Sequence, residues 1–173
     1  MLDIKIGDAT RLEARVVALE WTAHTVPDDD AEALGLTGIE VPRASGVYAL
    51  TGRHDTHHSD SVLYIGQGDD IASRMPSSVR DHVCEMNKRT VAGFYSDVWD
   101  LTLRWAELSV GLLASVERLL LMSHSPAFNS QLVRRDGPRD DELDLLIFNA
   151  GRKGPLLPIV AGWYLTEWKR RRR

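Results

Sequence analysis

Two short runs of strand-forming residues decide the fold of this chain: residues 46–50, Gly-Val-Tyr-Ala-Leu, and residues 61–66, Ser-Val-Leu-Tyr-Ile-Gly. Branched and aromatic side chains fit a pleated, half-buried strand. The polar stretch 51–60 between the two runs is typical of a hairpin loop. We therefore expect two antiparallel strands. With the loop centred on that stretch, Tyr48 and Tyr64 lie about opposite one another, with their side chains on a common face.

Four further elements are expected after this hairpin. Asp69 and Asp70 are suited to cap a helix, and Pro76 must end or kink that helix because proline has no amide donor. The elements are a helix over 71–75, a second helical piece over 77–86, a strand over 99–108 and an apolar helix over 111–123 that Ser125 and Pro126 stop. Their order predicts an α+β fold with a small antiparallel three-stranded sheet flanked by helices.

The chain is expected to hold one domain with an extension on each side. Its 173 residues, of which 43% are hydrophobic, have the size and the apolar content of one ordinary domain. The predicted parts are an N-terminal extension over 1–43, a domain over 44–132 and a C-terminal extension over 133–173 with a basic tail.

The extensions have weaker patterns of their own. Residues 12–21 alternate loosely and fit a strand or a short helix, and the aspartates after Pro27 favour the start of a helix. Residues 142–148 are apolar enough for a strand or a helix. Residues 155–168 predict a terminal element packed on the core or on a partner.

Composition excludes several classes of protein. The single cysteine, Cys84, excludes an internal disulfide and a cysteine-based zinc cage, and we expect it to be a small buried residue. No apolar run reaches the roughly 20 residues of a membrane span. The start of the chain, Met-Leu-Asp-Ile-Lys, lacks the pattern of a secretory signal. These features predict a soluble protein of a reducing compartment, the cytoplasm, with no membrane partner.

Charge is unevenly distributed along the chain. The net charge of −4 argues mildly against a protein that coats nucleic acid by bulk electrostatics. Residues 1–130, however, hold 11 Lys and Arg against 19 Asp and Glu, whereas residues 131–173 hold 10 against 6 and end in Lys169 and four arginines. A cationic end on an acidic body suits a polyanion bound from one side. It suits equally a solvated tail that keeps the terminal element soluble.

The hairpin and the elements after it carry five features of a known family. Gly46-Val47-Tyr48 and Tyr64-Ile65-Gly66 are similar to the paired strand motifs that name the GIY-YIG nucleases. Arg74 follows on the first helix, Glu117 lies in the apolar helix, and residues 126–129, Pro-Ala-Phe-Asn, resemble the family's proline-to-asparagine element. The five features occur in the expected order over residues 44–132. The resemblance therefore implies the GIY-YIG fold and an endonuclease.

Hydrolysis of a phosphodiester needs an activated water and relief of negative charge at the phosphorus. The resemblance makes Tyr48 the general base and Tyr64 its partner in positioning water or phosphate. It also makes Arg74 the phosphate-binding group, Glu117 the one protein ligand of a hydrated Mg²⁺ or Mn²⁺, and Asn129 a hydrogen-bonding brace. These residue types suit the chemistry, since guanidinium matches phosphate and a carboxylate holds a hard divalent cation. The implied partner is nucleic acid, DNA in preference to RNA.

Each of these residues also has an ordinary structural interpretation. The two tyrosines are common strand aromatics, Arg74 fits a solvated charge on a helix, and Asn129 fits a turn or a cap. Glu117 is harder to explain in this way, because a charge among leucines is costly unless it is paired or metal-bound. The joint arrangement, and not any one member, favours the functional interpretation.

The sequence also departs from the family. Many members have a tyrosine or histidine one helical turn after the arginine, where this chain has Ser78, and His82 one turn further on is the candidate substitute. A basic residue often follows the second motif, where this chain has Gln67. Both departures remove phosphate-binding or proton-handling capacity. They predict low activity, and they keep open a second hypothesis, a weak or inactive module that binds nucleic acid or a protein.

A second cluster of metal-ligating residue types lies in the hairpin loop, and it is expected to be a solvated loop and not a metal site. Strands of about five residues place it on the order of 15 Å from the glycine end of the hairpin. The cluster consists of His54, Asp55, His57, His58 and Asp60.

Overall fold

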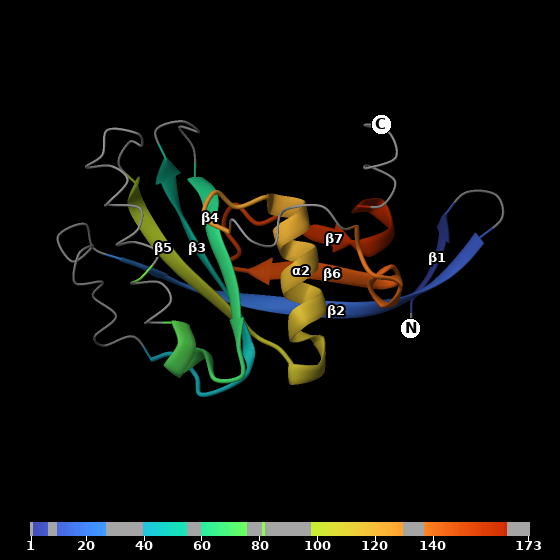
Figure 1. Cartoon of the computed structure of the whole chain (residues 1–173), viewed down its shortest axis with the longest axis horizontal. Helices are drawn as coiled ribbons and strands as arrows, with labels where there is room; N and C mark the ends of the chain where they lie inside the picture. The colour runs from blue at the N-terminus through green and yellow to red at the C-terminus, as the bar shows by residue number, and fades with distance from the viewer. Residues whose placement is uncertain are drawn as a thin grey trace.

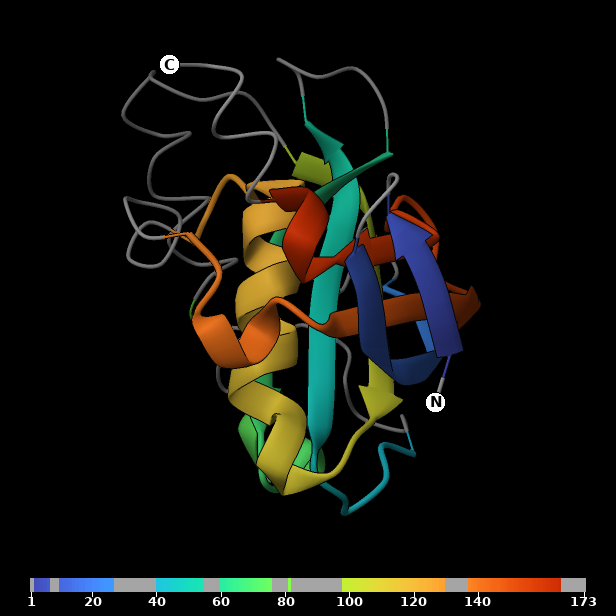
Figure 2. The ribbon, with the colours of Figure 1, turned by 90° about the vertical axis from the view of Figure 1, so that its right-hand side faces the viewer.

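The computed structural model describes residues 2–6, 10–26, 40–54, 60–75, 81, 98–129 and 137–165. Within these residues the fold is α+β, with one curled sheet and a helix, α2, packed on it (Figures 1 and 2). The strands are β1 (Leu2–Ile6), β2 (Thr10–Thr25), β3 (Gly46–His54), β4 (Asp60–Gly68), β5 (Val98–Glu107), β6 (Leu145–Gly151) and β7 (Ile159–Ala161). The helices are α2 (Leu113–His124) and the 3₁₀ turns η2 (Val110–Leu112) and η3 (Asp140–Glu142).

The described strands form one mixed sheet in the order β4-β3-β5-β2-β6-β7, with β1 paired to β2. β3 is antiparallel to each of its neighbours, β4 and β5, as expected for the hairpin and the third strand. The sheet continues through β2, which is antiparallel to β5 but parallel to β6. The prediction of a small three-stranded antiparallel sheet is therefore wrong. It missed the pairing of residues 15–21 with residues 145–151, because segments so far apart in sequence leave no local pattern.

β2 is the longest strand and resolves the ambiguous pattern at residues 12–21 as a strand. Val17, Leu19 and Trp21 are buried, and Ala18 and Glu20 between them are exposed, which is the two-residue period of a strand with one covered face. The same strand contacts β1 at its start, β6 in its middle and β5 at its end. Residues of all three predicted parts of the chain thus contribute strands to one sheet.

The hairpin of β3 and β4 has a register that differs from the expected one. Tyr48 pairs with Gly66, and Leu50 pairs with Tyr64. The two tyrosines therefore lie on one face but are diagonal neighbours, and the prediction that they lie about opposite one another is wrong. The strands extend to His54 and Asp60, further into the polar stretch than expected, and the register shifts at a bulge after Leu50.

The two faces of the sheet carry separate buried clusters. On one face, Val116, Leu119 and Leu120 of α2 pack with Val47 and Ala49 of β3. The helical residues 71–75 cover the other face. Ile71 and Met75, one helical turn apart, pack there with Tyr48, Leu50 and Leu103.

The C-terminal part of the described chain completes the first cluster. The apolar run at 142–148 includes the last residue of η3 and the first part of β6, and residues 155–165 include β7 and a helical turn after it. Leu156, Val160 and Leu165 pack against α2 and β6, which supports the expected terminal element on the core. The helix expected after Pro27 and the second helical piece over 77–86 lie outside the described residues, apart from Asp81.

Candidate functional site

Three of the predicted side chains lie along one face of β4: Tyr64 of β4 itself, Tyr48 of β3 and Arg74 of the helical segment 71–75. Tyr64, Gly66 and Gly68 alternate along the strand and so share that face. A Cβ at Gly66 would lie 2.6 Å from Cζ of Tyr48, and a Cβ at Gly68 would lie 3.0 Å from Cβ of Arg74. The two glycines therefore make room for the Tyr48 ring and for the Arg74 stem, and they place Tyr64, Tyr48 and Arg74 in one row.

The two tyrosines of this row are in ring contact. Their centroids lie 6.1 Å apart, and the ring planes are tilted by 40°; the separation is within the range that aromatic pairs favour. Tyr48 is only 1% exposed, whereas Tyr64 is half-buried at the edge of the same cluster. The phenol of Tyr64 is thus the more accessible of the two.

Arg74 is positioned by the short helical segment 71–75. The amide of Ile71 donates to the carbonyl of Ala44 at 2.9 Å, which fixes the start of the segment. The amide of Ser73 donates to Oδ1 of Asp70 at 3.3 Å, so Asp70 is the expected N-cap. Ile71 and Met75 bury the inner side of this turn, and the side chain of Arg74 is left exposed.

Glu117 lies half-buried on α2 between the buried Val116 and Leu119. Burial raises the pKa of its carboxyl to about 7, and the nearby Arg74 guanidinium acts in the opposite direction. Arg74 is therefore close enough to sense the charge of Glu117. Desolvation is the larger effect, so Arg74 offsets only part of the cost of the buried negative charge, and a further cation would stabilise the carboxylate.

A pocket of about 470 Å³ adjoins this pair, between the end of β4 and the first turn of α2. β4 is the outer strand at this end of the sheet, so α2 on one face and residues 71–75 on the other meet beside it (Figures 1 and 2). Leu113 and Ala114 precede Glu117 by one helical turn and therefore lie on its side of α2. The pocket is lined by Gln67, Gly68, Asp69, Arg74, Val110, Leu113 and Ala114.

Asn129 binds the outer edge of β4. The amide of Ile65 donates to Oδ1 of Asn129 at 2.9 Å, and Nδ2 of Asn129 donates to the carbonyl of Ile65 at 2.8 Å. The amide of Phe128 donates to the carbonyl of Leu63 at 3.1 Å. These bonds satisfy backbone groups that an outer strand would otherwise leave unpaired. Asn129 thus braces the strand that carries Tyr64, as the sequence led us to expect, and its part in any reaction stays a prediction.

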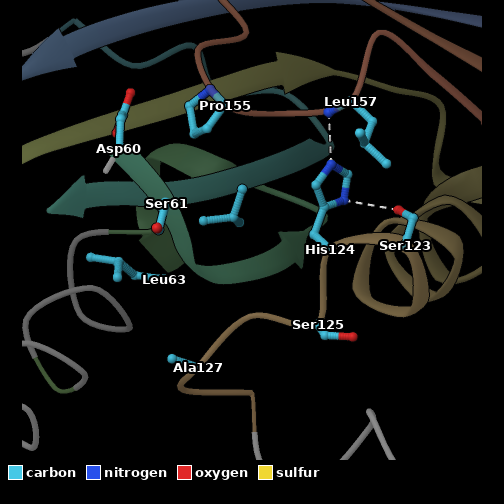
Figure 3. A pocket seen from close by; sticks show the side chains of 10 residues that line it. Asp60, Ser61, Leu63, Ser123, His124, Ser125, Ala127, Pro155 and Leu157 are labelled. Atoms are coloured by element: carbon cyan, nitrogen blue, oxygen red, sulfur yellow. Dashed lines mark hydrogen bonds between the residues drawn. The ribbon is translucent and has the colours of Figure 1, made fainter. Parts of the chain in front are cut away.

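A second pocket, of about 370 Å³, lies at the other end of α2 around His124 (Figure 3). The amide of Leu157 donates to Nε2 of His124 at 2.8 Å, so Nδ1 carries the proton and donates to the carbonyl of Leu120 at 2.8 Å. Burial lowers the pKa of His124. Nε2 thus ties α2 to the segment before β7, whereas Nδ1 bonds back to α2 itself. The pocket lacks the predicted catalytic and metal-ligating residues.

Several predicted residues lie outside the described part of the chain. They are Ser78, His82 and Cys84, and, from the hairpin loop, Asp55, His57, His58 and the side chain of His54. Asp60, the described member of the loop cluster, lies 3.9 Å from the guanidinium of Arg104. Among the described residues, no three His, Cys, Asp or Glu side chains form a group that could hold a metal ion.

A divalent cation at Glu117 nevertheless suits the donor chemistry. Mg²⁺ commonly binds proteins through one or two carboxylates and keeps several of its waters. Glu117 supplies one half-buried carboxylate, one helical turn along α2 from Leu113 and Ala114, which line the open pocket. The residues present therefore fit a hydrated Mg²⁺ or Mn²⁺ with Glu117 as the protein ligand.

Comparisons of this chain with models of protein families, with curated proteins and with solved structures find no match. In the described part of the chain, no helix has the length and apolar character needed to cross a membrane.

The pocket lined by Arg74 also contains residues that the sequence does not single out for a site. Val110 and Ala114 have no reactive or charged group that would mark them in the sequence, and the position of Asp69 in the sequence indicates only a helix cap.

Proposed function

We propose that this chain is a metal-dependent endonuclease with a site of the GIY-YIG type, hydrolysing phosphodiester bonds of nucleic acid, DNA in preference to RNA. One observation carries the proposal. Tyr64, Tyr48 and Arg74 follow one another along one face of β4, and Arg74 lies within electrostatic reach of the half-buried Glu117. A guanidinium suits the binding of phosphate, a carboxylate suits a hard divalent cation, and a phenol can act as a general base.

In this proposal each residue has one task. Arg74 binds the scissile phosphate through planar donors that stay charged. Tyr48 accepts the proton of the attacking water, Tyr64 orients that water or the phosphate, and Asn129 holds the backbone of β4 in place. Glu117 holds Mg²⁺ or Mn²⁺, which when bound supplies a Lewis acid at the phosphoryl oxygens. His82 is the further candidate for proton transfer.

A second function is favoured by two observations. Tyr48 is 1% exposed, whereas a general base must reach water. Gln67 at the pocket is uncharged where the family often has a basic residue. Both features suit a GIY-YIG-like module that binds nucleic acid or a protein and has weak turnover or none. We place the protein in the cytoplasm under either function.

The test is cleavage of plasmid and of single-stranded DNA by the purified protein. We expect nicking or cutting with Mg²⁺ or Mn²⁺ and none with chelator. Glu117→Gln should abolish it, since glutamine keeps the volume and removes the anionic ligand. Glu107→Gln, which makes the same change at an exposed position, should not affect it. Cleavage that survives chelation or Glu117→Gln refutes the metal role, and folded protein that binds DNA without cutting it supports the second function.

A further inference from the structure

The pocket beside Arg74 and Glu117 has two chemically different walls. The end of β4 and the turn after it supply the polar wall, in which Gln67 offers an amide, Asp69 a carboxylate and Arg74 a guanidinium. An amide both donates and accepts hydrogen bonds, whereas a carboxylate only accepts them. This wall therefore has an acceptor-rich end at Asp69 and a cationic end at Arg74.

The facing wall is apolar and comes from the start of α2. Val110, Leu113 and Ala114 form it. Val110 is 61% exposed, and Ala114 is also exposed, so apolar surface is presented to the pocket at its mouth. The small side chain of Ala114, one helical turn before Glu117, keeps the pocket wide at the point nearest to the candidate site.

We propose that this pocket takes an unpaired nucleobase that carries an exocyclic amino group, next to the phosphate bound by Arg74. The inference rests on the proposed function, because it takes nucleic acid as the ligand. The volume of about 470 Å³ falls within the range of roughly 300–1,000 Å³ for small-ligand sites. A base is flat and apolar on its faces and polar along its edges, which matches one apolar wall and one polar wall.

The amino group follows from Asp69. Cytosine, adenine and guanine present an amino donor that a carboxylate accepts. Thymine and uracil lack that group, and their ring N–H lies between two carbonyl oxygens that a carboxylate repels. The carboxylate also disfavours a second phosphate in the pocket, so the backbone is directed to Arg74 and the base to Asp69. Gln67 completes the edge, since it can donate to a ring nitrogen or a carbonyl of the same base.

The base must be unpaired to enter. In a duplex the amino groups are engaged in pairing and the faces are covered by stacked neighbours. Only a single strand, an end or an extruded nucleotide can place one base between α2 and the end of β4. The inferred substrate class is therefore DNA with unpaired C, A or G beside the cleaved bond.

The test is binding of labelled oligo(dC), oligo(dT) and a duplex of equal length, measured by fluorescence anisotropy in chelator. A correct base contact contributes about 1–3 kcal/mol of discrimination, so we expect oligo(dC) to bind about tenfold more tightly than oligo(dT) and more tightly than the duplex. Asp69→Asn should reduce the preference for oligo(dC) to about twofold or less. Asp100→Asn is the control, because it removes the same charge elsewhere and asparagine tolerates the positive φ of that position.

Filling the pocket gives an independent arm. Ala114→Leu should weaken oligo(dC) binding about tenfold, and Ala18→Leu, which adds the same bulk at an exposed position of β2 outside the pocket lining, should not. Equal affinity for oligo(dC) and oligo(dT), or a preference that Asp69→Asn leaves intact, overturns the inference. Because binding is measured without metal, a protein that prefers oligo(dC) but never cuts contradicts the proposed nuclease and not the pocket. A protein that cuts without this preference contradicts the pocket and not the nuclease.

Discussion

Replacing Glu117 by glutamine should stabilise the protein at neutral and alkaline pH. The carboxyl has an ordinary pKa of 4.5 in the unfolded chain and a pKa of about 7 in the fold, because burial on α2 disfavours the charged form. Below 4.5 both states bind the proton, and the wild-type protein has its full stability. As the pH rises from 4.5 through about 7, the unfolded chain releases the proton first, and the wild-type protein loses stability relative to the glutamine variant.

The size of the effect follows from the shift. At 1.36 kcal/mol per pKa unit, a change from 4.5 to about 7 corresponds to about 3 kcal/mol of unfolding free energy. This is an upper bound, since the half-buried carboxylate is partly solvated and is attracted to Arg74. We expect the variant to match the wild type below 4.5 and to exceed it by about 1–3 kcal/mol above 7.

Urea unfolding at a series of pH values measures this difference, with Glu107→Gln as an exposed control that should follow the wild type. Adding Mg²⁺ above pH 7 should then raise the stability of the wild type but not that of Glu117→Gln, because a ligand that binds only the folded state stabilises it. A constant difference across the pH range would refute the account of Glu117. Equal stabilisation of both proteins by Mg²⁺ would refute its assignment as the metal ligand.

Three other predictions concern the tyrosine pair, a glycine and the histidine of the second pocket. Tyr48→Phe should lower the cleavage rate about 10²–10⁴-fold, as removal of a general base does, and Tyr64→Phe less; equal small losses in single-turnover assays would make both of them packing residues. Gly66→Ala should lower the free energy of unfolding by about 1–3 kcal/mol through overpacking, since its Cβ would lie 2.6 Å from the Tyr48 ring. The control Gly111→Ala, whose Cβ meets nothing within 4 Å, should leave the free energy of unfolding unchanged in the same urea titration. The fold lowers the pKa of His124 from 6.5, so the wild type should lose stability as the pH falls below 6.5, and His124→Gln should lack that loss. The same fall in unfolding free energy with pH in both proteins would contradict this prediction.

Local patterns predicted the elements that surround the strand motifs. The hairpin, the strand of β5 and the apolar helix α2 each have a periodicity or a stop signal within their own residues, and each occurs where it is expected. The brace by Asn129 is also present, as its two bonds to Ile65 show. Local sequence was sufficient for the three elements because turn and cap chemistry acts over a few residues. The brace joins residues 64 positions apart, and it was expected from the family resemblance and not from a local pattern.

Features that depend on distant segments were not predictable in the same way. The loose alternation at 12–21 gave no sign that β2 lies inside the sheet between β5 and β6. The diagonal placement of Tyr48 and Tyr64 depends on the register of the hairpin and on its bulge, and the polar stretch between the strands does not specify either. The burial of Tyr48 results from Ile71 and Met75 packing on the same face, which is tertiary structure.

The position of β2 also constrains when the chain can fold. Residues 15–21 leave the ribosome early, but the parallel partner to which they bond, residues 145–151, is synthesised after nearly all other described strands. Until then the outer edge of β2 has unpaired backbone groups, and Val17, Leu19 and Trp21 on its covered face lack the β6 side chains of their cluster. The hairpin of β3 and β4 needs no such wait, since its contacts are local. A nascent or truncated chain that ends before β6 would therefore hold a formed hairpin beside an open sheet edge, the state in which aggregation or recognition by a chaperone is most expected.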